Sequence, residues 1–72
     1  MNVSESDKQK LRDTVASYIR SNKSSLLVLS TDDRLRLLMR IIAGEAFRLN
    51  IVNSMDEMDA YYIAEKEWLR LI

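Results

Sequence analysis

The stretch TDDRLRLLMRIIAGEAFRL, residues 31–49, decides the fold class of this 72-residue chain. Its apolar residues recur every three or four positions, which is the period of an α-helix, and two aspartates in its first turn suit the positive end of the helix dipole. Projected around a helix, the residues of a core face fall within an arc of about 100°: Leu35, Leu38, Met39, Ile42, Ala46 and Leu49. The stretch therefore predicts a helix that buries this face.

The same helix is apolar on a second side. Leu37 and Ile41 lie roughly opposite the core face, and Gly44 continues their row at helical spacing. A helix that is apolar on more than one side is central in its fold or shared with another chain. Either residues 26–29 fold over this row, or a second subunit contacts it where Gly44 permits close backbone approach. In both cases we expect Leu37 to be largely buried in the assembled protein.

The N-terminal part of the chain predicts an amphipathic helix over residues 6–20. Ser6 and Gln9 have the spacing of a capping box, and Ser4 with Asp7 is a weaker alternative. Its apolar stripe is narrow and its other face is charged, so we expect an ordinary amphipathic helix.

The connection that follows has a polar, turn-forming part and an apolar part. Residues 21–25 are turn-forming and are expected to end the first helix. Residues 26–29 are apolar, and periodicity over so short a run does not separate a buried linker, a helical turn and a short strand.

A third helix is predicted over residues 55–71. Ser54 and Glu57 give it a second capping box. One apolar face is shared by Met55, Met58, Tyr62 and Leu69, with Tyr61, Trp68 and Ile72 beside it and Leu71 widening the arc. Such an apolar C-terminal segment is expected to be covered by something, because free tails fray.

Length and composition indicate a single all-α domain over residues 1–72, a bundle of three helices, or four if residues 26–29 add a turn. A core of this size is marginal, and small domains usually add disulfides, a metal or a partner subunit. The chain has no Cys and no His, which excludes a disulfide framework and an ordinary zinc site. The remaining ways to stabilise so small a core are oligomerisation or an unusually apolar contact surface between its helices.

Catalytic chemistry is not supported by the residue types present. A Ser or Thr nucleophile would lack a His base, and a single glycine excludes the glycine-rich phosphate and calcium loops. The acidic cluster of Asp56, Glu57 and Asp59 fits a helix first turn better than a metal site. We therefore expect no enzyme activity, no cofactor and no bound metal.

Charge is balanced overall but uneven along the chain. Eleven basic and eleven acidic residues cancel, whereas residues 1–50 carry a balance of +3 (nine bases, six acids) and residues 51–72 of −3 (two bases, five acids). This polarity suits an oppositely charged neighbour within or between chains. The longest uncharged run, residues 24–31, is far below the roughly 20 residues that span a bilayer. With a polar N-terminus unlike a signal peptide, the expected location is the cytoplasm, the host cytosol for a viral chain, without membrane contact.

Arg36 and Arg40 share a helical row with Phe47 and are candidate anion contacts. Arginines beside an aromatic ring can hold a phosphate and stack a base, so a nucleotide-type ligand could lie at an oligomer seam. The simpler interpretation pairs these arginines with the acidic third helix and places Phe47 in the core.

The function predicted is that of a small protein-interaction module, a regulator, adaptor or inhibitor acting through an apolar helical surface as a homodimer or higher homo-oligomer. The candidate interface residues are Leu37, Ile41, Gly44, Phe47, Tyr61, Trp68, Leu71 and Ile72. Two alternatives stay open. One is a nucleic-acid-binding transcriptional regulator, whose recognition helix would be the acidic third helix. The other is a small-ligand or nucleotide-binding protein.

Overall fold

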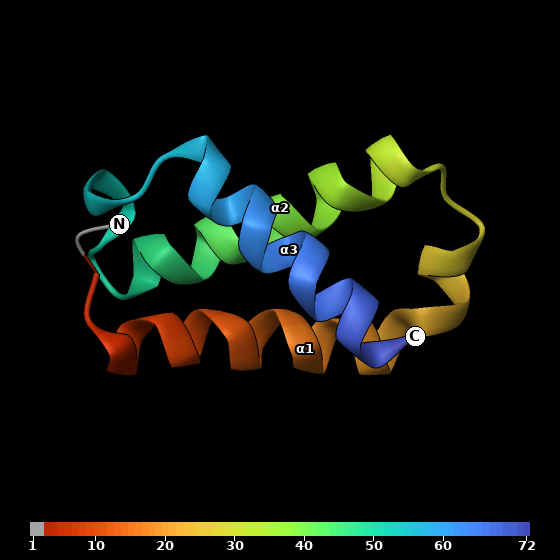
Figure 1. Cartoon of the computed structure of the whole chain (residues 1–72), viewed down its shortest axis with the longest axis horizontal. Coiled ribbons are helices and arrows are strands. Elements are labelled where there is room, and N and C mark those ends of the chain that lie inside the picture. The colour runs from red at the N-terminus through yellow and green to blue at the C-terminus, as the bar shows by residue number, and fades with distance from the viewer. Residues whose placement is uncertain (1–2) are drawn as a thin grey trace.

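The computed structural model describes residues 3–72, and this part of the chain forms three α-helices joined by short connections (Figure 1). A single turn of 3-10 helix precedes the last one. In chain order the elements are α1 (Glu5–Leu27), α2 (Thr31–Arg48), η1 (Val52–Ser54) and α3 (Glu57–Leu71). No strand occurs within residues 3–72, so the predicted all-α, three-helix fold is confirmed.

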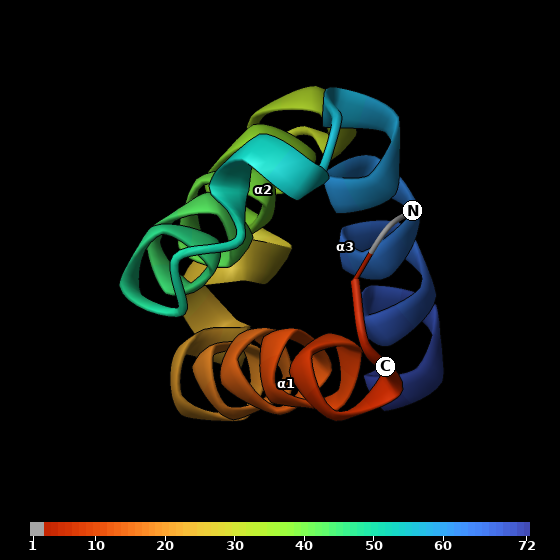
Figure 2. The same ribbon diagram turned by 90° about the vertical axis from the view of Figure 1, so that its left-hand side faces the viewer.

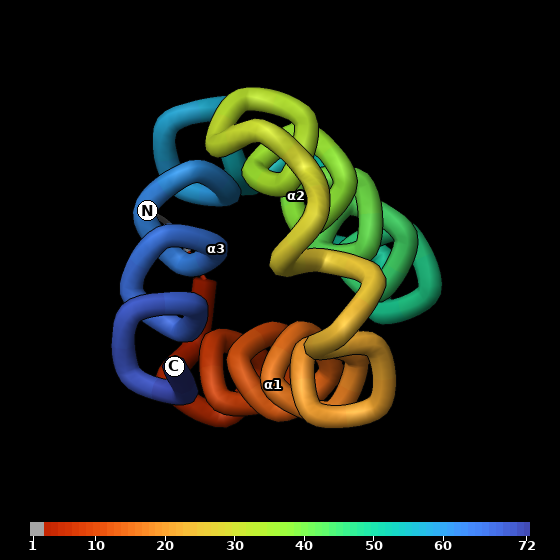
Figure 3. The backbone as a smooth tube through the Cα atoms, turned by 90° about the vertical axis from the view of Figure 1, so that its right-hand side faces the viewer, coloured from red at the N-terminus to blue at the C-terminus, as the bar shows by residue number. Residues whose placement is uncertain are grey.

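The three helices surround one core. α1 and α2 lie side by side and run in opposite directions, and α3 crosses them obliquely (Figure 1). Seen from either end, the helices form the sides of a triangle (Figure 2 and Figure 3), and each packs against the other two.

The start of α1 follows the weaker of the two predicted caps. The Ser4 hydroxyl accepts a hydrogen bond from the Asp7 backbone N–H at 3.1 Å, so the predicted Ser6 capping box is wrong. The Gln9 side chain, which that box required, instead contacts Arg12 and Asp13 on the helix surface. With Ser4 as the N-cap, the carboxylate of Asp7 lies in the first turn, where the helix dipole favours it.

α1 continues to Leu27, so the predicted end at residue 20 is also wrong. The polar run bends the helix without ending it, because only Asn22 leaves helical geometry (φ −128°, ψ 22°). Its side-chain amide donates to the Tyr18 carbonyl at 3.0 Å and so replaces a disrupted backbone bond. Residues 26–29 form the last turn and the connection rather than a fourth helix, and they bring Leu26 into the core.

α2 begins as predicted, with Ser30 accepting from the Asp33 backbone N–H at 3.2 Å. It ends in a Schellman motif, in which the Ile51 N–H donates to the Ala46 carbonyl and the Asn50 N–H to the Phe47 carbonyl. Asn50 supplies the positive φ of 61° that this motif requires, and asparagine tolerates that conformation better than most residues.

α3 begins later than the predicted residue 55. Asp56 is its N-cap, and its carboxylate accepts from the Asp59 N–H at 2.9 Å while the Asp59 carboxylate accepts from the Asp56 N–H at 3.1 Å. The predicted Ser54–Glu57 capping box is therefore wrong. Ser54 lies in η1 instead, and the reciprocal Asp56–Asp59 bonds satisfy two otherwise unpaired backbone donors.

The core face of α2 is the predicted one, because Leu38, Ile42 and Ala46 are buried. On α3 the buried apolar residues are Ala60, Ala64 and Trp68. Of the apolar face predicted for this helix, Met55 packs against the core, whereas Met58, Tyr62 and Leu69 are exposed. The core cluster consists of Leu11, Val15, Ile19, Leu26, Leu38, Ile42, Ala46, Ala60, Ala64 and Trp68. The small alanines let α3 approach the other two helices closely, and Trp68 supplies the bulk where they diverge.

Arg34 joins the ends of the three helices. Its guanidinium carbon lies 4.3 Å from the centre of the Trp68 ring, and its Nη1 donates to the carbonyls of Leu26 and Leu29 at 3.4 Å each. A residue of α2 therefore caps the C-terminal end of α1 and stacks on α3.

Candidate functional site

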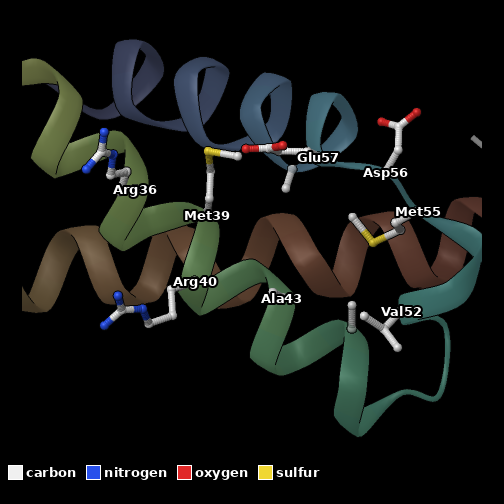
Figure 4. A pocket seen from close by; sticks show the side chains of 10 residues that line it. Arg36, Met39, Arg40, Ala43, Val52, Met55, Asp56 and Glu57 are labelled. Carbon is white, nitrogen blue, oxygen red and sulfur yellow. The ribbon is translucent and has the colours of Figure 1, made fainter.

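A groove of about 460 Å³ lies between α2, η1 and the start of α3 (Figure 4). Its lining is mostly apolar, with charged side chains at the edges. The lining residues are Arg36, Met39, Arg40, Ala43, Ala46, Val52, Met55, Asp56, Glu57 and Ala60. It is a concave surface to which a partner could bind.

The local structure of each element explains why the groove exists. The Schellman motif and η1 turn the chain back so that Val52 and Met55 line the groove opposite α2. Three alanines, Ala43, Ala46 and Ala60, line it where the helices face each other, and their short side chains leave the volume open. The groove therefore results from small residues at a helix crossing.

The charges around the groove are separated. Arg36 and Arg40 project from α2 at one end, and Asp56 lies toward the other (Figure 4). Neither arginine makes an ion pair within residues 3–72, so the predicted pairing with the acidic third helix is wrong. Both arginines are exposed and are positioned to meet a ligand's negative charge.

The ion pairs on α2 and α3 join residues of the same helix. Arg48 Nε lies 2.6 Å from Glu45 Oε1, and Arg70 Nε lies 2.6 Å from Glu67 Oε2. The hydrogen bond from Arg48 lowers the pKa of Glu45 below its ordinary value. These two arginines are occupied, which leaves Arg36 and Arg40 to define the basic end of the groove.

Phe47 lies on the surface, with 76% of its area exposed, so its predicted place in the core is wrong. It follows Arg36, Arg40 and Ala43 along one outward stripe of α2, one turn beyond the groove residues. Phe47 does not line the groove, so the arginine–aromatic clamp for a nucleotide is not assembled within the described residues.

The row of Leu37, Ile41 and Gly44 is only partly covered. Leu37 packs against the core cluster and is partly exposed, as is Ile41. Gly44 is exposed, and a Cβ at this position would meet nothing within 4 Å among residues 3–72. The backbone at Gly44 is therefore open on this side, and the close approach of a second subunit there stays a prediction.

Some of the candidate interface residues near the C-terminus lie in the core, and others lie on the surface. Trp68 is buried and Leu71 packs half-buried on the core, so neither lies open for a partner. Ile72 is exposed. Tyr61 is half-buried, and its hydroxyl donates to Glu65 Oε2 at 3.0 Å, a bond that raises the pKa of the phenol.

The outward face of α3 carries Met58, Tyr62 and Leu69 as large exposed side chains. The sequence placed all three on one apolar face that something should cover, but no part of residues 3–72 covers these three side chains, and none of them was among the named interface residues. With Glu65 and Ile72 they stand at positions 58, 62, 65, 69 and 72, in alternating steps of four and three, which is the spacing of a helix–helix contact surface.

The acidic cluster at the start of α3 is explained by helix capping, because Asp56 and Asp59 bind each other's backbone. Within residues 3–72 no three His, Cys, Asp or Glu side chains are grouped so that they could hold a metal ion. Among the described helices, none has the combined length and apolar content needed to cross a membrane.

Comparison with known proteins found no matching family model, no matching curated protein and no matching solved structure. The two surfaces described above, the groove and the outward face of α3, are therefore the candidate sites of function.

Proposed function

We propose that this protein is a small protein-binding module that holds an amphipathic helix of another protein in the groove between α2 and α3. The observation that carries the proposal is a mostly apolar groove with two arginines at one end, which make no ion pair within residues 3–72, and with Asp56 toward the other (Figure 4). Helix-in-groove recognition uses this combination, in which apolar anchors give affinity and the rim charges set orientation.

The lining defines the chemistry of the bound helix. The alanines leave room for side chains the size of Leu, Met or Phe, and Met39 and Met55 adapt their shape to what they contact. Arg36 and Arg40, one helical turn apart, favour Asp or Glu on the ligand. Asp56 favours Lys or Arg toward its other end. The module acts as a regulator, adaptor or inhibitor by covering its partner's apolar face.

A small anionic ligand is the second candidate, because the groove volume lies within the roughly 300–1,000 Å³ usual for small-molecule sites. Nucleic acid is less favoured. Arg34 stacks on Trp68 and Arg48 pairs with Glu45, so only two arginines of α2 remain for phosphates.

The test is a selection of binders from a random library of helical peptides against the wild-type protein. We expect selected peptides with apolar residues at i, i+3 or i+4, and i+7 and with acidic residues at one end. Ala43→Phe, which fills the groove from its exposed edge, is expected to weaken their binding at least tenfold. Ser17→Phe on the exposed face of α1 is the matched control and leaves binding unchanged.

Charge reversal tests the orientation. Arg40→Glu is expected to weaken the same peptides several-fold, whereas Arg20→Glu on α1, also exposed and without an ion pair in residues 3–72, leaves them unaffected. Peptides that bind Ala43→Phe as tightly as wild type would contradict the proposal. Failure to select peptides, together with thermal stabilisation by inorganic phosphate that Arg40→Glu abolishes, would favour the small-ligand alternative.

A further inference from the structure

The outward face of α3 carries a continuous row of large apolar side chains. Met58, Tyr62, Leu69 and Ile72 are 52%, 55%, 64% and 57% exposed. With Glu65 between them, the positions 58, 62, 65, 69 and 72 alternate in steps of four and three. This is the spacing with which the a and d positions of a coiled coil face a partner helix. We call these five residues the α3 seam.

The seam has no partner helix within residues 3–72. α3 turns its opposite face, with Ala60, Ala64 and Trp68, toward the bundle, and it forms one side of the triangle seen in Figure 3. The seam lies on the other side of α3, along a helix about 22 Å long at 1.5 Å per residue. An ordinary solvated helix would place charged residues at these positions.

We propose that a second copy of this chain packs on the α3 seam, with the two α3 helices antiparallel about a two-fold axis. When the same row of residues on each of two copies forms the contact, the dimer is isologous and each residue contact occurs twice. The charges select the antiparallel arrangement. Parallel helices in register would place Glu65 opposite Glu65 of the second copy, and two like charges opposed in an apolar seam are destabilising.

The antiparallel arrangement pairs chemically suited residues. It places Met58 against Leu69 of the second copy and Tyr62 against Glu65 of the second copy. Glu65 Oε2 already accepts from Tyr61, and no donor within residues 3–72 meets the other carboxylate oxygen, so that oxygen can accept from the Tyr62 hydroxyl. The central acidic residue thus obtains a hydrogen-bond partner instead of a like charge.

The flank of the seam is also complementary. Asp59 and Lys66 lie on the same side of it, seven residues apart, and antiparallel packing brings Lys66 near Asp59 of the second copy, twice per dimer. Lys66 makes no ion pair within residues 3–72. A small stable interface buries about 600 Å² per copy, roughly one-eighth of the 4746 Å² surface of this chain.

Sedimentation equilibrium of the wild-type chain and two variants tests the dimer. We expect wild type to be dimeric at micromolar concentration and Leu69→Glu to raise the dissociation constant at least tenfold. Val28→Glu is the matched control, because Val28 is 83% exposed but lies outside α3, and it leaves the constant unchanged. Circular dichroism checks that each variant keeps its helices. Wild type that stays monomeric to about 100 µM, or a Leu69→Glu variant as dimeric as wild type, overturns the proposal.

The orientation is tested by disulfide formation, since the chain has no cysteine of its own. Met58→Cys and Leu69→Cys chains carrying tags of different mass are mixed and oxidised. Antiparallel packing predicts a mixed disulfide, whereas parallel packing predicts each variant linked to itself. A mixed species no more abundant than either self-linked species overturns the antiparallel seam.

The seam and the groove lie on different faces of α3 and can fail separately. Ala43→Phe and Arg40→Glu are expected to leave the dimerisation constant unchanged, and Leu69→Glu is expected to leave peptide binding unchanged. Loss of one property with retention of the other identifies which of the two proposals is wrong.

Discussion

α1 and α3 are both amphipathic by sequence, but they use their apolar residues in opposite ways. α1 buries its large aliphatic side chains, Leu11, Val15 and Ile19, and leaves a polar outer face. α3 buries mainly Ala60, Ala64 and Trp68 and leaves the large side chains of its seam in solvent. The bundle covers the large apolar residues of α1 except Leu27 at its C-terminal end, whereas it covers α3 on one side only. The difference locates the surface at which this protein would gain most from a partner.

The largest expected effect separates the inner face of α1 from the outer face of α3. Ile19→Ala removes a fully buried side chain from the core, and we expect the free energy of unfolding to fall by about 2–5 kcal/mol. Leu69→Ala removes an exposed side chain of similar size, and we expect a loss below about 0.5 kcal/mol in the monomer. Urea unfolding at protein concentrations below dimerisation measures both. Equal losses would remove the distinction between the two helices.

The second-largest effect is expected for Arg34, whose contacts join the inner face of α3 to the C-terminal end of α1. Arg34→Ala removes the stacking on Trp68 and two hydrogen bonds to carbonyls at the end of α1, and we expect a loss of about 2 kcal/mol. Arg36→Ala, on the same helix but exposed, is the control and should change stability by less than about 0.5 kcal/mol. Thermal unfolding followed by circular dichroism reports both. An Arg34→Ala variant as stable as the control would show that stacking contributes nothing.

The smallest effect concerns how α3 begins. Asp56→Ala breaks the reciprocal Asp56–Asp59 cap, and we expect a loss of about 1 kcal/mol. Ser54→Ala alters the residue that the sequence pattern favoured as the cap, and we expect a change below about 0.5 kcal/mol because Ser54 lies in η1. Urea unfolding of the two variants compares them. A larger loss for Ser54→Ala would place the cap where the sequence first indicated it.

Prediction from sequence worked best for α2 and least well for α3. In α2 the large apolar residues were also the core residues, so Leu38, Ile42 and Ala46 were identified by periodicity. In α3 the same reasoning grouped the larger side chains, Met58, Tyr62 and Leu69, on one apolar face, but it did not identify Ala60, Ala64 and Trp68 as the face that meets the bundle. Periodicity reports which residues share a face but not which of two apolar faces meets the bundle.

The groove was anticipated only in part. Arg36 and Arg40 were candidate anion contacts from the sequence, and both line it. Val52 and Met55 were not anticipated, because their place opposite α2 depends on the Schellman turn at Asn50 and on η1. Phe47 was a candidate interface residue, with the core as the simpler alternative, and it lies exposed beyond the groove on the outer stripe of α2.

The helical character of the chain and the start of α2 follow from local sequence, because caps, first-turn charges and helical bonds join residues at most four apart. Long-range packing sets the path of α1 through Asn22, which buries Leu26, and the inward orientation of the alanines of α3. Both outcomes depend on the volume that α1 and α2 leave between them, and that volume is set by residues far apart in the chain. The same packing leaves the seam of α3 exposed.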